Sequence, residues 1–247
     1  MAIKAFVIHL ERAQGRRLQA QRLRAALPLA AAVLPAVDGL KLTAADIGRV
    51  VQPRLHRPHY PFALTRTEVA CFLSHRRAWQ AIVDQGLDAG LVVEDDAEPS
   101  ASDFAAVLEA ASVGLRQDEF IRFPHRERHE PGPVVRTRDG VRLLEPRLPA
   151  LGMVAQLVGR EAARLLLDAS WSFDRPVDSF VQMQWLHGAR VLTARPIVVR
   201  EICGELGGSV IHAPRAGFVH KMIHEINRPL LRRAVWRANE QWRRKAA

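Results

Sequence analysis

The sequence predicts an α/β protein with a mixed, mostly parallel sheet flanked by helices. Short apolar segments of strand type alternate with longer segments of helical periodicity, which is typical of parallel strands joined by crossover helices. The turn dipeptide Asp139-Gly140 lies between two strand-like segments and predicts one antiparallel hairpin. The chain has 247 residues, 48% of them hydrophobic and 25% charged, so it is long enough and apolar enough to bury a core.

The first quarter of the chain is expected to form strands, helices and an irregular loop. An apolar strand at residues 3–10 leads into an arginine-rich helix at 11–27, and a second strand follows at 31–37. Thr43 is a residue type that caps helices, and we expect a short helix after it. Three prolines make residues 50–64 an irregular loop.

A long helix then begins at a capping box. Thr65 is the expected N-cap, and the side chain of Glu68 is expected to bond back to it. Helical spacing of apolar residues continues to about Gln85, and it places Glu68 and His75 on one face. The buried strand that follows ends in an acidic cluster, Glu94, Asp95 and Asp96.

The rest of the chain continues the alternation of strands and helices. Ser100 is the expected cap of a helix that ends near Gly114. The elements expected after it are a strand at 120–123, strands around the hairpin within 134–158, a helix at 160–169 and a strand at 191–199.

Residues 216–247 are expected to form a basic amphipathic helical tail behind a main domain of residues 1–215. Either this helix packs on its own domain, or residues 228–247 bind an anionic membrane surface. No segment approaches the roughly 20 apolar residues of a membrane span. The apolar run before Glu11 is too short for a signal peptide. We expect a cytoplasmic protein, peripheral on the inner face of the cytoplasmic membrane if the tail binds it.

The formal net charge of +10 predicts a polyanionic partner: nucleic acid, an anionic membrane or a phosphate-bearing substrate. Aromatic residues are only 6% of the chain, and Tyr60 is its single tyrosine. Binding of single-stranded nucleic acid requires aromatic stacking platforms, so no nucleic-acid partner is expected. Cys71 and Cys203 are expected to be buried thiols.

Glu94, Asp95 and Asp96 concentrate negative charge within a basic chain. Such close carboxylates repel one another unless a cation lies between them. If the strand stays extended, Glu94 and Asp96 point to one side and form a pair of oxygen ligands for a divalent cation; if it turns, Asp95 and Asp96 form the pair. The alternative is that the acids only cap the next helix.

Arg12 and Arg16 open the basic helix directly after the first strand. The free backbone N–H groups of a helix start and the forks of arginine side chains both favour phosphate, so this position predicts a diphosphate site. The glycine pattern of a phosphate-binding loop is missing. The alternative is an exposed, arginine-rich helix face.

Several motifs together resemble glycosyltransferase family 25. In the family's order they are Phe6-Val7-Ile8-His9-Leu10-Glu11-Arg12 with Arg16-Arg17, Pro35-Ala36-Val37-Asp38-Gly39, Thr65-x-x-Glu68-Val69-Ala70-Cys71-Phe72-Leu73-Ser74-His75-x-x-Ala78-Trp79, Leu91-Val92-Val93-Glu94-Asp95-Asp96, Gly152 to Leu167, and Pro176-Val177-Asp178. The resemblance covers most of residues 3–212 and implies a GT-A-type, Rossmann-like fold. It also implies inverting, metal-dependent transfer of a galactose-like sugar from a nucleotide sugar, typically UDP-galactose, to a saccharide or glycolipid acceptor of the lipopolysaccharide or lipooligosaccharide type.

The resemblance implies roles for individual residues at the donor site. The donor would be bound by His9, Arg12, Arg16, Asp38, Glu94 and Asp95, and a divalent metal, typically Mn²⁺, by Asp96 and Glu94. Two positions depart from the family pattern. His9 stands where the family has Asn, and Val210 stands where it has Asp. The contact of that Asp to the metal or the acceptor would then shift to His212, and His212 or His220 could supply a nitrogen ligand to the metal.

Asp178, Glu68 and His75 are the candidate catalytic residues. Asp178 follows the aromatic segment Trp171 to Phe173, whose low polarity is expected to raise its pKa and suit it as a general base; its alternative role is a helix N-cap. Glu68 is the competing base, and its alternative role is the capping box. His75 is expected to contact the diphosphate or the acceptor, and the alternative is an ordinary buried histidine.

Three other functions remain open. The charge would suit a non-catalytic module that binds nucleic acid or another polyanion, although this leaves the acidic cluster unexplained. The same carboxylates would suit a metal-dependent phosphohydrolase or nucleotidyltransferase. The departures at His9 and Val210 would suit a relative that binds without turnover.

Overall fold

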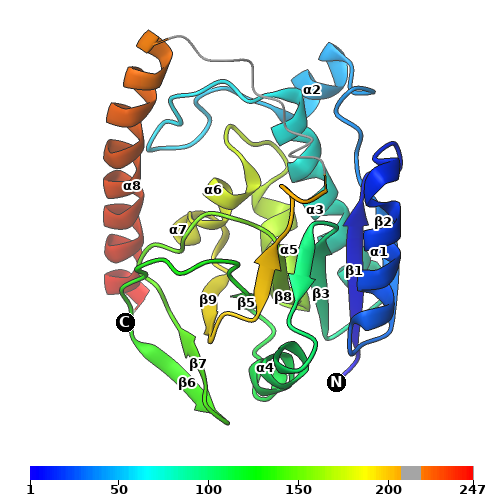
Figure 1. Ribbon diagram of the computed structural model, residues 1–247. Helices are drawn as coiled ribbons and strands as arrows, with labels where there is room; N and C mark the ends of the chain where they lie inside the picture. The colour runs from blue at the N-terminus through cyan, green and yellow to red at the C-terminus, as the bar shows by residue number, and fades with distance from the viewer. Residues whose placement is uncertain (207–217, 247) are drawn as a thin grey trace.

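The computed structural model describes residues 1–206 and 218–246 of the chain. An eight-stranded sheet runs through the middle and helices cover both of its faces (Figure 1). Helices α1 and α4 contribute apolar side chains to the core on one face, and α3, α5 and α6 to the core on the other. The predicted α/β class with a mixed sheet flanked by helices is confirmed, and the arrangement is consistent with a GT-A-like Rossmann fold.

The strand order of the sheet is β2-β1-β3-β8-β5-β9-β7-β6. The pairs β1–β2, β1–β3 and β5–β9 are parallel. The Asp139-Gly140 hairpin is confirmed as the antiparallel pair β6–β7, but β8 also runs antiparallel to β3 and β5, which the sequence did not indicate. The strands are β1 (Ile3–His9), β2 (Ala31–Pro35), β3 (Ala89–Glu94), β4 (Ala97–Pro99), β5 (Glu119–Arg122), β6 (Val134–Arg138), β7 (Val141–Leu144), β8 (Ala155–Gly159), β9 (Arg190–Arg195) and β10 (Val199–Glu201).

The helices are α1 (Gln14–Ala26), α2 (Ala44–Val50), α3 (Arg66–Asp84), α4 (Asp103–Ser112), α5 (Arg160–Ala169), α6 (Val177–Val181), α7 (Gln184–His187) and α8 (Phe218–Ala246). Helices α1 to α5 and α8 lie close to where the sequence predicted helices, whereas α6 and α7 were not among the predicted elements.

Helix α3 shows both features that the sequence predicted for it. Thr65 is its N-cap, and the reciprocal bonds of the capping box with Glu68 are present. At its other end Gly86 adopts a left-handed φ of +61°, which glycine tolerates without strain. The helix then lies so close to β3 that a Cβ at Gly90 would come within 2.4 Å of Ile82 Cγ1. This close packing fixes α3 against the strand that ends in the acidic cluster.

The prediction that Ser100 caps a helix is wrong. Helix α4 begins later, at Asp103, and Ser102 is the residue before it. The hydroxyl of Ser100 bonds the Asp103 carboxylate at 3.0 Å instead. Strand β4 intervenes between the acidic cluster and α4, where it pairs with β10 in a separate small sheet. The acids therefore cannot cap this helix.

The single strand expected at residues 191–199 is divided in two. Strand β9 ends at Arg195, and β10 begins at Val199. Pro196 lies between them, and it has no N–H to continue the hydrogen-bond ladder of the sheet.

Helix α8 lies within the helical tail expected at residues 216–247, and it packs beside α7 at one side of the molecule (Figure 1). Its Val235 and Asn239 are buried, and Asn239 Nδ2 donates to the backbone oxygens of Arg147 and Gln182. Part of this helix therefore packs on its own domain. No helix in the described part of the chain combines the length and apolar character needed to cross a membrane.

Candidate functional site

Two adjoining cavities open where the parallel strands end. The small cavity, about 150 Å³, is lined by residues that follow β1 and β2 and by the end of β3. The large cavity, about 500 Å³, lies between α3, α6 and α8. Glu94 and Cys71 line both cavities. Ligands of open α/β sheets bind at the carboxyl ends of strands, so this is the expected place for a site.

The acidic cluster surrounds a cation that belongs to the chain itself. Arg16 Nη1 donates to Asp95 Oδ1 at 3.0 Å and to Asp96 Oδ2 at 3.1 Å. The other oxygen of Asp95 lies 2.7 Å from Nδ1 of His9. All four side chains are buried. The backbone turns after β3, so Asp95 and Asp96 do converge, but they converge on a guanidinium. Arg16 is therefore not part of the exposed arginine face that the sequence left as an alternative.

Asp96 keeps one carboxylate oxygen unsatisfied. Its Oδ1 is buried and has no hydrogen-bond partner among the described residues. Burial, together with the nearby charge of Glu94, raises the pKa of Asp96 to about 7, although Arg16 acts against this shift. An unpaired buried carboxylate oxygen on a cavity wall, with Glu94 on the same wall, fits a hard divalent cation. Asp95 fits less well, because both of its oxygens are already bonded.

His75 pairs with Glu94 instead of Glu68. The imidazole, fully buried in α3, places Nε2 3.1 Å from Glu94 Oε1. Cys71 lies one turn earlier on the same helix, and the ligand atoms of Cys71, His75 and Glu94 all lie within 4.8 Å of one another. These three residues form a second donor set that could hold a metal ion, softer than the first because it offers sulfur and nitrogen.

Arg12 lines the small cavity and forms an ion pair with Asp38, which is not one of the lining residues. Arg12 Nε donates to Asp38 Oδ1 at 2.9 Å, and Leu40 N–H donates to the same oxygen at 3.0 Å. Burial acts to raise the pKa of Asp38, but these hydrogen bonds hold it below its usual value. His9, by contrast, lines neither of the two cavities and contacts the site only through Asp95.

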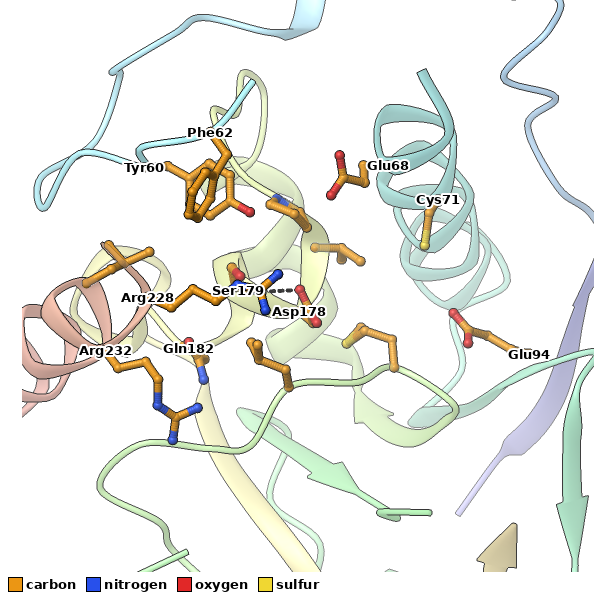
Figure 2. Close-up of a pocket in the computed structure, with 15 residues that line it drawn as sticks. Tyr60, Phe62, Glu68, Cys71, Glu94, Asp178, Ser179, Gln182, Arg228 and Arg232 are labelled. Atoms are coloured by element: carbon orange, nitrogen blue, oxygen red, sulfur yellow. Dashed lines mark hydrogen bonds between the residues drawn. The ribbon is translucent and has the colours of Figure 1, made fainter. Parts of the chain in front are cut away.

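Asp178 and Glu68 both face the large cavity, from α6 and α3 (Figure 2). Burial raises the pKa of Asp178, while the N–H groups of Ser179 and Gly152 act against the rise. Asp178 is not a helix N-cap, because Pro176 holds that position in α6. Glu68 is committed to the capping box through Oε2, which accepts both donors of Thr65.

The structure also brings residues to the site that the sequence did not single out for it. Tyr60 and Phe62 come from the proline-rich loop and pack edge to face, with ring centroids 5.3 Å apart, on one wall of the large cavity. Arg228 and Arg232 reach the same cavity from α8. The i, i+4 spacing of Cys71 and His75 could have indicated that both lie on one face of the helix. No local sequence pattern indicated that the site also includes Tyr60, Phe62, Arg228 and Arg232. His212 and Val210 lie outside the described residues.

Comparisons with known proteins indicate the family of the chain. Residues 2–139 match the sequence model of "Glycosyltransferase family 25 (LPS biosynthesis protein)". The chain is 38% identical to procollagen galactosyltransferase 1 of Danio rerio over 96 residues, which are 38% of this chain and 16% of that protein. It is 30% identical to a glycosyltransferase 25 family member of Drosophila melanogaster over 190 residues, 74% of this chain and 30% of that one.

Some relatives are named as inactive members of the family. The chain is 37% identical to the inactive glycosyltransferase 25 family member 3 of Homo sapiens over 99 residues, 38% of this chain and 16% of that protein. The alignments thus span well under half the length of these relatives. The family match, however, extends over more than half of the chain, and the chain belongs to glycosyltransferase family 25.

Proposed function

We propose that the chain is an inverting hexosyltransferase that moves a galactose-like sugar from a UDP-linked donor to a saccharide acceptor, with a divalent metal such as Mn²⁺. The observation that carries the proposal is the position of Glu94 on the shared wall of the two cavities. This wall separates a small cavity with arginines and acids from a large cavity with carboxylates and aromatic rings. A donor diphosphate suits the first and an acceptor sugar suits the second.

The small cavity supplies the donor contacts. Arg12 lines it and remains partly exposed, so its guanidinium is available to a diphosphate even while it bonds Asp38. Asp96 and Glu94 would hold the metal, which neutralises the charge of the leaving diphosphate when bound. Arg16 and His9 hold Asp95 in place beside Asp96, and His75 holds Glu94. In this proposal these residues orient the ligands and do not touch the sugar.

Asp178 is the proposed general base. Its raised pKa makes its carboxylate a better proton acceptor, and the backbone N–H groups of Ser179 and Gly152 hold it toward the cavity. The acceptor hydroxyl gives its proton to Asp178 as its oxygen bonds the anomeric carbon. The bond between that carbon and the diphosphate oxygen breaks, and the configuration inverts. Glu68 is the competing base, but one of its oxygens is already occupied by Thr65.

The acceptor is proposed to be a saccharide of the lipopolysaccharide type. The family description names lipopolysaccharide biosynthesis, and three relatives are named procollagen galactosyltransferases. The further proposal that the chain works at the inner face of the cytoplasmic membrane rests on the basic residues of α8. Vesicle flotation of the full chain tests it, and it fails if anionic vesicles bind no more protein than neutral ones.

The enzyme class is tested by thermal stabilisation with UDP-, GDP- and CMP-sugars, each with and without Mn²⁺. A UDP-hexose with Mn²⁺ is expected to raise the Tm, because a ligand that binds only the folded state stabilises it. Asp96→Asn should fold but lose this shift, whereas Asp103→Asn, an exposed acid on α4, should retain it. If the nucleotide sugar raised the Tm equally in excess chelator, a role of the metal in donor binding would be excluded. If no nucleotide sugar changed the Tm, the proposed function would be excluded.

A further inference from the structure

Two arginines of α8 line the large cavity and pair with no carboxylate of the described residues. Arg228 and Arg232 lie one turn apart on the helix, and both are exposed at the cavity rim (Figure 2). Neither forms an ion pair or a hydrogen bond with another described residue, whereas the arginines that border the core, such as Arg122, Arg175 and Arg195, pair with acids. Two exposed guanidinium groups one helical turn apart at a cavity form an anion site of the kind that suits phosphate or carboxylate.

Contacts farther along α8 fix the position of these arginines. Val235 is buried, Asn239 donates to two backbone oxygens of the domain, and Arg243 donates to the backbone oxygen of Pro146 at 2.8 Å. A helix anchored in this way places Arg228 and Arg232 at a defined position, so an anion bound there would have a fixed position relative to the other residues that line the cavity.

The same cavity also has carboxylates on its walls. Glu68, Glu94 and Asp178 face it from α3, β3 and α6 (Figure 2). Tyr60 lines the same cavity, and burial and the charges of Glu68 and Asp178 raise the pKa of its hydroxyl, while Arg228 acts against the shift. A ligand with one anionic group can therefore enter in a single direction, with that group at the arginines and an uncharged part near Asp178.

We propose that Arg228 and Arg232 bind an anionic group of the acceptor, so that the acceptor is a saccharide carrying a phosphate or a carboxylate. The proposal rests on the proposed function, and it adds the charge and the orientation of the acceptor to it. The arginines hold the anionic end, the rings of Tyr60 and Phe62 offer an apolar wall for a sugar face, and a hydroxyl at the far end reaches Asp178.

The test compares binding of glucose 6-phosphate, glucose and inorganic phosphate to the full chain by ligand-observed NMR or calorimetry. The variants are Arg228→Gln/Arg232→Gln and a matched control, Arg233→Gln/Arg237→Gln, which removes the same charge from exposed positions of α8 that do not line the cavity. Glucose 6-phosphate should bind at least about tenfold more tightly than either other probe, since the charge-assisted bonds and the ring contact add. The first variant should lose about tenfold in affinity, and the control should change little.

The proposal would be overturned if glucose 6-phosphate bound with the same affinity as glucose, or with the same affinity as inorganic phosphate. An equal loss of affinity for glucose 6-phosphate in both variants would also overturn it, because such a loss would show a general effect of charge, such as attraction to an anionic surface. Hydrolysis of the nucleotide sugar is measured beside binding, and it should be unchanged in the control variant Arg233→Gln/Arg237→Gln. If the wild type binds no nucleotide sugar but still prefers the sugar phosphate through these arginines, the proposed function fails and the anion site stands.

Discussion

Arg16 decides the electrostatics of the acidic cluster at the scale of single residues. Its guanidinium bonds two buried carboxylates, and a buried charge left without its partner is strongly destabilising. Arg16→Met should therefore lower the free energy of unfolding by about 3 to 5 kcal/mol at neutral pH, as measured by urea denaturation. The neighbouring Arg17 is exposed, and Arg17→Met should change stability by less than about 0.5 kcal/mol.

The double variant Arg16→Met/Asp95→Asn separates charge from packing. It removes one of the two carboxylates that Arg16 neutralises, so part of the lost stability should return. If the double variant is no more stable than Arg16→Met alone, the loss comes from packing and the electrostatic account is wrong.

Asp178 and Glu68 can be distinguished by activity. Loss of a general base typically costs about 10²- to 10⁴-fold in rate, so Asp178→Asn should lower kcat by that factor with little change in the KM of the donor. Glu68→Gln keeps the acceptor oxygen needed by the capping box and should lower kcat far less. A larger loss in Glu68→Gln than in Asp178→Asn, with both variants folded by circular dichroism, would reverse the assignment.

Helix α3 and strand β3 position the site at the scale of secondary-structure elements. Gly90 allows them to approach, because a Cβ there would lie 2.4 Å from Ile82 Cγ1 and 2.6 Å from Cδ1. Gly90→Ala should destabilise the fold by about 1 to 3 kcal/mol, since overpacking a close interface forces side chains and backbone to move. It should also weaken donor binding, because β3 carries Glu94 toward His75 of α3.

The control for this contact is Gly48→Ala in α2, where nothing lies within 4 Å of the added Cβ. It should be neutral or stabilise the helix by about 0.5 to 1 kcal/mol. The double variant Gly90→Ala/Ile82→Val should recover part of the stability because it shortens the Ile82 side chain. Thermal unfolding curves check both expectations, and a harmless Gly90→Ala would contradict the close approach.

At the scale of the whole molecule, the features predicted correctly from the sequence are those that depend on residues close to one another in the chain. The capping box at Thr65 and Glu68 and the Asp139-Gly140 hairpin depend on neighbouring residues, and both were predicted correctly. The partner of Arg16 lies 79 residues away, and Arg228 is brought to Tyr60 by the packing of α8. Such contacts follow from the tertiary fold, so no local pattern could predict them. The antiparallel insertion of β8 belongs to the same class, since strand direction depends on the path of the intervening chain.

Acid stability is a property of the whole molecule to which single groups contribute with opposite signs. Burial lowers the pKa of His187 from 6.5 to about 4 in the folded protein. Its Nε2 faces the backbone oxygen of Val181 at 3.1 Å, and its Nδ1 accepts the N–H of Ala189 at 3.1 Å, so the neutral ring is already satisfied. Below pH 6.5 the unfolded chain takes up a proton at this ring and the folded protein does not. This group therefore lowers stability as the pH falls from about 6.5 to 4.

His187→Gln should remove this contribution, which amounts to roughly 3 kcal/mol between pH 6.5 and 4 at about 1.4 kcal/mol per pKa unit. Asp96 acts in the opposite sense, because its pKa is raised to about 7 and the folded protein takes up its proton first on acidification. The measurement is therefore the difference between wild type and variant, from urea denaturation at several pH values. This difference in the free energy of unfolding should narrow as the pH falls, because the wild type loses the contribution of His187. A difference independent of pH for His187→Gln would mean that its folded-state pKa is not depressed.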